Sequence, residues 1–335
     1  GKLNKAIETY KKAISIEPNN ASAHKFLSFA FLNNDQFIEG LEEYEWRWKT
    51  PQGLKVKRDF SQPLWTGSES LKNKTLLVWG EQGPQDMIIW SSCLRYLSNP
   101  DERYLLECPS KLTPLFSRSF PNIEVRENEK NEIKDFNFHV PMGSLYRCFH
   151  SKVLKRNINE AFLKPDPLRS QYWKNVLKSL GKGPFVGVSW KSPIVTTDRM
   201  PNYTDIMEWK NIFSLKDVNF INLQSTNFEN DLDKVKDTLG TKIHHFEELD
   251  HYDNLDDVSA LCQSLDMCVS VSTAVAAIAA GVGIPTIVPT WKQSSWNNIL
   301  LAPQGPNVKY YERNTWDSWD EVFAKIYIDV RNLTH

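Results

Sequence analysis

Polar residues that could act on a substrate come after an apolar run early in the chain. The run TLLVW, residues 75–79, leads through Gly80 into a turn that holds Glu81, Gln82, Gly83 and Asp86. A carboxylate in such a turn can remove a proton from a hydroxyl group, which makes Asp86 a candidate general base. Asp is also a favoured N-cap, so Asp86 could equally begin the next helix. The two roles are compatible.

A second group of polar residues lies in the other half of the chain and suits an anionic ligand. Lys191 and Arg199 come after the run FVGVSW, and their positive charges are suited to a diphosphate that leaves with negative charge. Ser272 and Thr273 separate another apolar run from a segment of Ala, Val and Ile. If that segment is a helix, the backbone N–H groups at its start favour an anion. By default, however, a Ser or Thr there is only an N-cap.

These turns require a framework that brings them together, and the hydrophobic pattern from Lys74 onward predicts one. Short apolar runs alternate with helix-length segments, first as TLLVWG, RYLLEC, IEVRE and FNFHVP, and then as FVGVSW, VNFINLQ, KIHHF, MCVSVS and PTIVPT. This alternation predicts two successive units of Rossmann type, each with a parallel sheet. Ligands of such sheets bind beyond the carboxyl ends of the strands, which is where the polar turns are expected.

The first 49 residues contain a helical repeat. Leu3, Ala6 and Tyr10 recur 34 positions later as Phe37, Gly40 and Tyr44, and 34 residues is the tetratricopeptide period. One and a half repeats cannot bury a core alone, so this segment must pack on the next part of the chain. Trp46 and Trp48 are the residues expected to dock it. The predicted domains are residues 1–49, a connector over 50–73, a first α/β domain over 74–165 and a second over 166–335.

Composition and charge exclude several classes of protein. The 335 residues carry a net charge of -1, so no basic surface for nucleic acid is expected. No apolar stretch reaches the ~18 to 20 residues of a spanning helix, and no signal peptide is visible, although the chain begins at Gly1 without Met. Five cysteines without metal-ligand spacing indicate buried reduced thiols and no metal site. A cytoplasmic protein is therefore expected, with the inner face of the membrane as an open alternative.

The order of several motifs resembles a known family. Tetratricopeptide repeats followed by EYEWRW, RDFSQPLWTG, TLLVWGEQGPQD, HVPMGSL, FVGVSWKS, FINLQS, DDVSALCQSLDMCVSVSTAVAAIAAGVGIPT and WDEVFAKI resemble bacterial repeat-containing glycosyltransferases related to the ADP-heptose heptosyltransferases. A more distant resemblance is to O-linked N-acetylglucosamine transferases. The resemblance implies an α/β fold of GT-B type, with two Rossmann-like domains, a nucleotide sugar held mainly by the second, and no catalytic metal or other cofactor. It also implies that the last helix, Ser318–Val330, crosses back to the first domain.

The resemblance also assigns roles to residues. The turn Ser272, Thr273, Ala274 and Val275 would hold the diphosphate, with Gln224 near the nucleoside and Arg199 among the residues that bind the donor. Lys191 would neutralise the leaving group, and Asp86 matches an acidic residue that deprotonates the acceptor. The acceptor side would be formed by Glu81, Gln82, Gly83 and the residues from Pro141 to Ser144, which include Gly143.

The chain departs from the family at two places, and the departures leave alternatives open. Gln85 stands where the family usually has Gly, Ser272 stands where it has Asp, and Ala276-Ala277 occupy the place of a His. The first expectation is a metal-independent inverting glycosyltransferase that uses a nucleotide sugar and a glycan, lipid-linked glycan or protein acceptor. The second is a catalytically inactive transferase fold that recruits a protein partner through its repeat helices. The third is a nucleotide-sugar epimerase on a similar fold.

Overall fold

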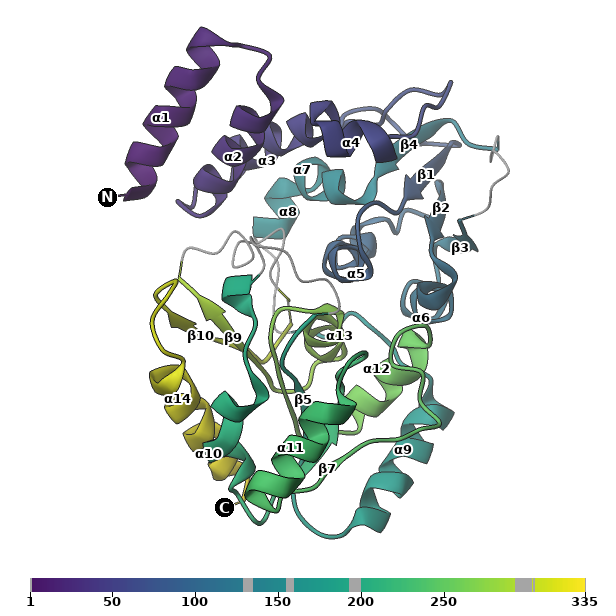
Figure 1. Cartoon of the computed structure of the whole chain (residues 1–335). Coiled ribbons are helices and arrows are strands. Elements are labelled where there is room, and N and C mark those ends of the chain that lie inside the picture. The colour runs from purple at the N-terminus through teal and green to yellow at the C-terminus, as the bar shows by residue number, and fades with distance from the viewer. Residues whose placement is uncertain are drawn as a thin grey trace. The chain divides into compact units, whose positions relative to one another are not determined.

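The computed structural model describes residues 2–128, 135–154, 160–192, 200–292, 303 and 305–334. The described chain forms two compact units (Figure 1). Unit 1 is built from Gly1–Pro109 and Phe120–Arg156, and unit 2 from Ser110–Ser119, Asn157–Lys292 and Pro303–His335. The segment Ser110–Ser119 thus belongs with unit 2 although it lies between two stretches of unit 1.

The N-terminal part of unit 1 is a set of paired helices, α1 (Lys2–Ile16), α2 (Ala21–Leu32) and α3 (Phe37–Tyr44). Asn20 begins α2, because its side-chain oxygen accepts a hydrogen bond from Ala23 N at 2.9 Å. A Cβ atom added at Gly40 would lie 2.6 Å from Leu32 Cγ. Even the methyl group of Ala would be crowded where α3 crosses α2, which accounts for Gly at this position.

The repeat helices continue into the connector through two short helices, η1 (Glu45–Lys49) and α4 (Pro51–Val56). The ring of Trp48 lies 5.2 Å from that of Trp79, so Trp48 docks on the α/β part of unit 1 as expected. Trp46 instead stacks on His24 within the repeat helices, with ring centroids 3.6 Å apart. Of the two tryptophans expected to dock the repeats, only Trp48 is seen to do so.

A four-stranded parallel sheet forms the core of unit 1, in the order β3-β2-β1-β4. Its strands are β1 (Thr75–Trp79), β2 (Arg103–Cys108), β3 (Glu124–Glu127) and β4 (Phe138–Pro141). The connector packs on this sheet rather than spanning free space, since Trp65 N donates to His139 O at 2.8 Å and His139 N donates to Pro63 O at 3.1 Å. The helical elements that accompany the sheet are α5 (Pro84–Ser91), η2 (Leu94–Tyr96), η4 (Met142–Ser144), α7 (Leu145–Cys148) and α8 (His150–Leu154).

Unit 2 contains a six-stranded parallel sheet in the order β10-β9-β8-β5-β6-β7. Its strands are β5 (Phe185–Ser189), β6 (Asn219–Asn222), β7 (Ile243–His244), β8 (Met267–Ser270), β9 (Thr286–Trp291) and β10 (Val308–Arg313). The helical elements of unit 2 are η3 (Ser110–Leu112), α6 (Thr113–Ser119), α9 (Pro167–Leu180), η5 (Met200–Asn202), η6 (Ile206–Trp209), α10 (Lys210–Phe213), α11 (Glu229–Leu239), α12 (Leu255–Gln263), α13 (Ala274–Val282), α14 (Asp320–Arg331) and η8 (Asn332–Thr334). Strand β10 and helix α9 were not predicted from the sequence.

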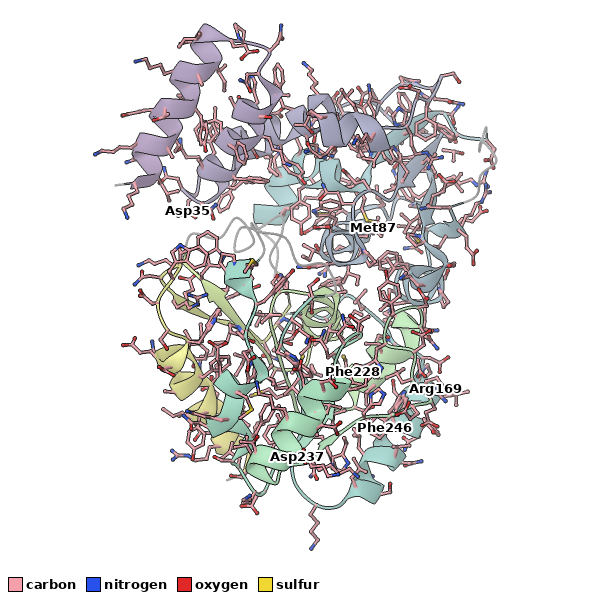
Figure 2. All side chains as sticks on the ribbon, in the orientation of Figure 1. Asp35, Met87, Arg169, Phe228, Asp237 and Phe246 are labelled. Carbon is pink, nitrogen blue, oxygen red and sulfur yellow. The ribbon has the colours of Figure 1, made fainter. Side chains whose placement is uncertain are left out.

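The last helix, α14, belongs to the core of unit 2. Phe228, which precedes α11 in the sequence, packs against the same core and is labelled in Figure 2. The residues of α14 that are buried in this core are Val322, Phe323, Ile326 and Val330. This packing covers the apolar face of α14 within unit 2, and the expectation that the last helix crosses back to the first domain stays a prediction.

Helix α13 consists of small residues because it is buried on all sides. Ala276, Ala277, Ala279 and Ala280 are each at most 1% exposed. A Cβ atom added at Gly281 would lie 2.6 Å from Leu163 Cδ1, and one added at Gly305 would lie 2.0 Å from Ala280 O. Close packing therefore accounts for the alanines, and Gly283, at φ 91°, ends the helix in the left-handed region.

Candidate functional site

Each sheet has a point where the strand order reverses, and the predicted residues gather at these two points. In unit 1 the order runs outward from β1 through β2 to β3 and, on the other side, to β4. Trp79 and Pro141, near the carboxyl ends of β1 and β4, are paired in register. The turns that come next, Gly80–Asp86 and Met142–Ser144, therefore leave the sheet side by side. Ligands of open parallel sheets bind at such switch points.

Asp86 is the third residue of helix α5 and is 7% exposed. Its Oδ2 accepts a hydrogen bond from Gly83 N at 3.2 Å, and Gly83 is the N-cap. The expectation that Asp86 is itself the N-cap is therefore wrong. A carboxylate within the first turn interacts favourably with the helix dipole.

Residues expected on the acceptor side are held by the end of the repeat segment. The Glu81 carboxylate binds Arg47 in a two-point ion pair, with Nε–Oε2 at 3.0 Å and Nη2–Oε1 at 2.7 Å. Glu81 Oε1 also accepts from Gly143 N at 2.9 Å, and Gln82 Nε2 donates to the Tyr44 hydroxyl at 2.9 Å. Burial raises the pKa of Tyr44, so its hydroxyl stays protonated.

Two of these partners, Tyr44 and Arg47, were not predicted as site residues, whereas Ser144, which also binds Arg47, was expected on the acceptor side. Ser144 is 1% exposed and its Oγ accepts from Arg47 Nη2 at 2.9 Å. The one available signal was an arginine between two tryptophans in EYEWRW, since a cation in an aromatic segment needs a buried acid to pair with. The sequence does not say which acid that is.

The switch point of unit 2 lies between β5 and β8. Ser189 and Ser270 are paired in register at the ends of these strands, and Val271 N donates to Ser189 O at 3.0 Å. The turns that carry Lys191 and Ser272 therefore begin next to each other. The structure places the predicted donor residues Lys191, Gln224, Ser272, Thr273, Ala274 and Val275 at the carboxyl edge of one sheet.

Gln224 lies just beyond β6 and is 1% exposed. Its side-chain oxygen accepts three hydrogen bonds, from Ser189 Oγ at 3.1 Å and from the backbone N–H groups of Trp190 and Lys191, both at 3.2 Å. In this structure Gln224 fixes the turn after β5. It thereby sets the position from which the Lys191 side chain extends.

Lys191 forms an ion pair that the sequence did not predict. Its Nζ lies 2.6 Å from Asp231 Oδ2, and Trp190 Nε1 donates to the same oxygen at 2.7 Å. Asp231 belongs to the first turn of α11, where the helix dipole favours an acidic residue. The Lys191 side chain is 29% exposed, so its ammonium group is reachable from solvent while paired.

Thr273 is the N-cap of α13, with extended backbone angles of φ -138° and ψ 175°. Its hydroxyl lies 3.2 Å from Ser270 Oγ instead of capping the helix. The first N–H groups of an α-helix, here from Ala274 and Val275, have no acceptor within the helix. They are therefore suited to an anion, as the sequence predicted.

The other predictions concern a second cation, metal binding, membrane helices and the cysteines. Arg199 lies outside the described residues. Among the residues that the structure describes, no group of three or more His, Cys, Asp or Glu could hold a metal ion, and no helix is long and apolar enough to cross a membrane. The five cysteines are free thiols, and all but the half-buried Cys148 are buried, as expected.

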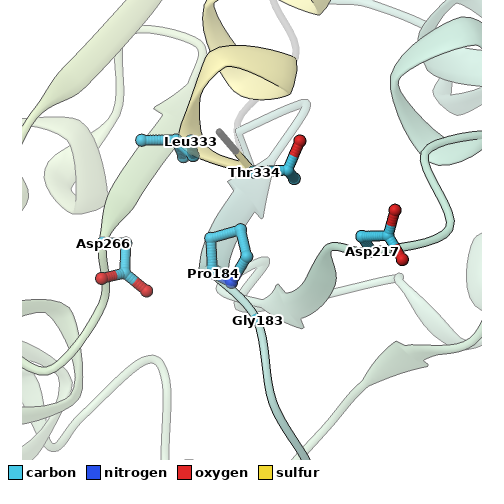
Figure 3. A pocket seen from close by; sticks show the side chains of 6 residues that line it. All are labelled: Gly183, Pro184, Asp217, Asp266, Leu333 and Thr334. Carbon is cyan, nitrogen blue, oxygen red and sulfur yellow. The ribbon is translucent and has the colours of Figure 1, made fainter.

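Two hollows in unit 2 lie away from the switch point. One hollow, of about 440 Å³, lies at the amino ends of the strands. Figure 3 shows the residues that line it, which are Gly183, Pro184, Asp217, Asp266, Leu333 and Thr334. A second, of about 670 Å³, lies near the carboxyl ends of β9 and β10 and is lined by Lys292, Arg313, Asn314 and several acidic residues. Neither contains a residue of the predicted site.

Known proteins resemble the chain in its repeats and in its fold. Residues 1–35 match the family model of the TPR repeat. Protein FlbA of Caulobacter vibrioides is 28% identical over 314 residues, which are 88% of this chain and 52% of that protein. The chain thus spans about half the length of this curated relative. The repeat predicted from the 34-residue period is confirmed.

Two solved structures show the fold. The ADP-heptose lps heptosyltransferase II of E. coli matches with a TM-score of 0.57 and 14% identity, over 78% of this chain and 98% of that one. The glycosyl transferase family 9 structure from Veillonella parvula matches with a TM-score of 0.55 and 9% identity, over 79% and 98%. The fold is that of the heptosyltransferases. The predicted α/β class with two parallel sheets after a helical repeat is confirmed, and the likeness to O-linked N-acetylglucosamine transferases stays a prediction.

Proposed function

We propose that the protein is a glycosyltransferase that moves a sugar from a nucleoside-diphosphate donor to a hydroxyl acceptor, with inversion at the anomeric carbon and without a metal. The observation that carries this proposal is the placement of the predicted residues. Asp86 lies at the switch point of one sheet, and Lys191 with the start of α13 lies at the switch point of the other. The fold shared with heptosyltransferases supports the same reaction class.

The proposed reaction divides its charges between the two units. The acceptor oxygen attacks the anomeric carbon and gives its proton to the Asp86 carboxylate. The bond from that carbon to the phosphate oxygen breaks, and the electron pair leaves with the nucleoside diphosphate. Lys191 and the first N–H groups of α13 then stabilise the charge on the leaving group. Attack on the face opposite the leaving group inverts the anomeric configuration.

Two polar contacts must loosen or be shared for this reaction. Asp86 Oδ2 accepts from Gly83 N, and Asp86 needs an oxygen directed at the acceptor. Lys191 is paired with Asp231, and a diphosphate has to compete with that carboxylate. A diphosphate carries more negative charge than one carboxylate, which favours the exchange when the donor binds.

The first experiment is a thermal-shift panel of ADP, UDP, GDP and CMP and their sugars, on the whole chain. We expect one nucleotide to raise the melting temperature, because ligands that bind only the folded state stabilise it. Turnover of the matching sugar is then measured with and without EDTA, and the anomeric configuration of the product is read by NMR. No stabilisation by any member would refute the proposal. A retained configuration, or loss of turnover in EDTA, would refute its finer parts.

Substitutions at the two switch points distinguish the proposed base, Asp86, from the proposed cation that binds the diphosphate, Lys191. Asp86→Asn is expected to reduce transfer ~10² to 10⁴-fold while leaving nucleotide binding intact. Lys191→Ala is expected to reduce transfer ~10² to 10³-fold, by analogy with other electrostatic donors, and to weaken nucleotide binding. Lys234→Ala is a matched control, since Lys234 on α11 pairs with Asp205 at 3.4 Å and was not predicted as a site residue.

A second candidate function is a nucleotide-binding protein that does not catalyse. The specific observation in its favour is that the proposed base and the proposed cation both have partners in the protein, Gly83 N and Asp231. Such a protein would be stabilised by a nucleotide but would show no transfer or donor hydrolysis. Asp86→Asn would then change neither property, which distinguishes this case from the enzyme.

A further inference from the structure

The side chain of Arg47 crosslinks three segments of unit 1. It lies in η1, at the end of the repeat helices, and is 5% exposed. All five of its N–H groups have acceptors, which are both oxygens of Glu81, Ser144 Oγ, Glu45 Oε1 at 2.9 Å and Tyr44 O at 3.3 Å. A guanidinium group that is fully used in this way has one orientation available.

Arg47 joins both turns of the switch point. Glu81 comes after β1 and Ser144 after β4, so the same guanidinium group contacts the turn after each of the two strands that flank the reversal. Glu81 also accepts from Gly143 N, and a Cβ atom added at Gly143 would lie 2.7 Å from Glu81 Oε1. The turns are thus held in contact with no room for a side chain at Gly143.

The turn after β1 is tied to the repeat helices a second time. Gln82 donates to the hydroxyl of Tyr44, the last residue of α3, which is 2% exposed. Gln82 has φ 61°, a backbone conformation that a residue with a side chain rarely adopts without support. Gly83, the next residue, is the N-cap of α5, and its N–H binds Asp86 Oδ2. A continuous set of contacts leads from the repeat segment to Asp86.

We propose that Arg47 is a positioning residue, through which the repeat segment sets the geometry of both switch-point turns of unit 1. The repeat segment is then part of the acceptor half of the protein and not an independent appendage for binding partners. The contribution to catalysis rests on the proposed function, with Asp86 as base. The proposed ordering of the two turns does not depend on the proposed function, and it is tested separately.

The test compares amide hydrogen exchange in the wild type and four variants of the whole chain. Arg47→Met removes the crosslink and leaves the Glu81 carboxylate buried without its cation. Arg47→Met with Glu81→Gln removes that buried charge as well, while the introduced amide oxygen can still accept from Gly143 N. Tyr44→Phe removes only the second tie. Arg58→Met with Glu107→Gln is the matched control, because it removes another Arg–Glu pair of unit 1, in which Glu107 is buried and the paired side chains bind neither turn.

If Arg47 positions the turns, the double variant at positions 47 and 81 recovers thermal stability but not protection. Its amides over 81–87 and 142–145 exchange at least about ten-fold faster than in the wild type, while those of β1 and β2 are unchanged. The control variant leaves both turns protected. If Arg47 only neutralises Glu81, the double variant recovers stability and turn protection together, and the proposal is wrong.

Two further readouts guard against ambiguous results. If the Arg47 variants unfold as a whole, Tyr44→Phe decides, since faster exchange confined to 82–86 supports the proposal and unchanged exchange overturns it. Affinity for ADP and UDP, which depends on unit 2, is expected to stay the same in every variant. If the wild type shows transfer, the double variant should lose at least about ten-fold in kcat with donor KM unchanged. If the wild type shows no transfer, the hydrogen-exchange data still decide whether Arg47 positions the turns.

Discussion

Lys191 Nζ and Asp231 Oδ2 lie 2.6 Å apart, so the cation predicted to meet a diphosphate is already paired with a carboxylate. The two side chains are 29% and 22% exposed, and Trp190 Nε1 binds the same oxygen. A pair this accessible contributes little stability, but it holds the Lys191 ammonium group at the first turn of α11. Asp231 therefore competes with any anionic ligand of Lys191.

Asp231→Asn is expected to raise the affinity for the stabilising nucleoside diphosphate about two- to five-fold, which corresponds to removing an exposed ion pair. The amide oxygen introduced by this substitution can still accept from Trp190, so the position of the turn is retained. Isothermal titration of ADP and UDP measures the effect, with Asp205→Asn, which changes the partner of Lys234, as the control. An unchanged or weaker affinity would mean that Lys191 does not bind the diphosphate.

Arg58 supports a second buried acid. Glu107, near the carboxyl end of β2, is fully buried and paired with Arg58 of the connector. Its Oε1 has no hydrogen-bond partner among the described residues. Arg58→Ala is expected to lower the free energy of unfolding by about 3–5 kcal/mol, because it leaves a buried carboxylate without its cation. Urea unfolding measures the loss, and Glu107→Gln in the same chain should restore part of it.

His139 makes stability depend on pH. Burial, followed by the charges of Arg58 and Lys57, lowers the pKa of His139 to about 4 from 6.5. Trp79 Nε1 donates to His139 Nδ1 at 3.2 Å, which requires an unprotonated nitrogen there. Between pH 6.5 and about 4 the unfolded chain binds more protons than the folded one at this residue, so the stability that His139 contributes is lost as the pH falls.

The expected size of this loss is about 1–2 kcal/mol, because the ring is only half buried and solvent screens part of the effect. His139→Gln should remove that part of the pH dependence. Urea unfolding of both forms at pH 7, 5.5 and 4.5 tests it. Equal pH dependence in the two forms would show that His139 does not titrate as described.

The alanines of helix α13 are interpreted as a result of close packing, and a substitution in this helix tests that interpretation. Ala279 is fully buried, and replacing it by Leu is expected to cost at least about 1–3 kcal/mol, because the added atoms have no space. Ala324→Leu makes the same change at an exposed position of α14 and should stay within about 0.5 kcal/mol of the wild type. If the two variants were equally stable, close packing would not explain why α13 is built from small residues.

The sequence was sufficient to locate most elements and the edge of each sheet at which polar turns gather. Apolar runs alternating with helix-length segments predict parallel strands, and parallel strands place their carboxyl ends at one edge. Asp86 after β1 and Lys191 after β5 could be placed there without coordinates. The pattern failed for β10, because this strand lies at the edge of the sheet and no residue of VKYYER is fully buried. It also failed for α9, because prolines usually interrupt a helix, whereas Pro167 begins this one.

Which charges meet could be learned only from the packing of distant segments. Arg47 and Glu81 are 34 positions apart in sequence, and Lys191 and Asp231 are 40 apart. Hydrophobic periodicity records which face of an element is buried, but it carries no information on which cation faces which acid across a fold. Those pairs depend on the packing of η1 against the turns of the first sheet and on the contact of the first turn of α11 with the turn after β5. The sequence thus located the candidate residues, and tertiary packing made Glu81 a support of the site and gave Lys191 a partner.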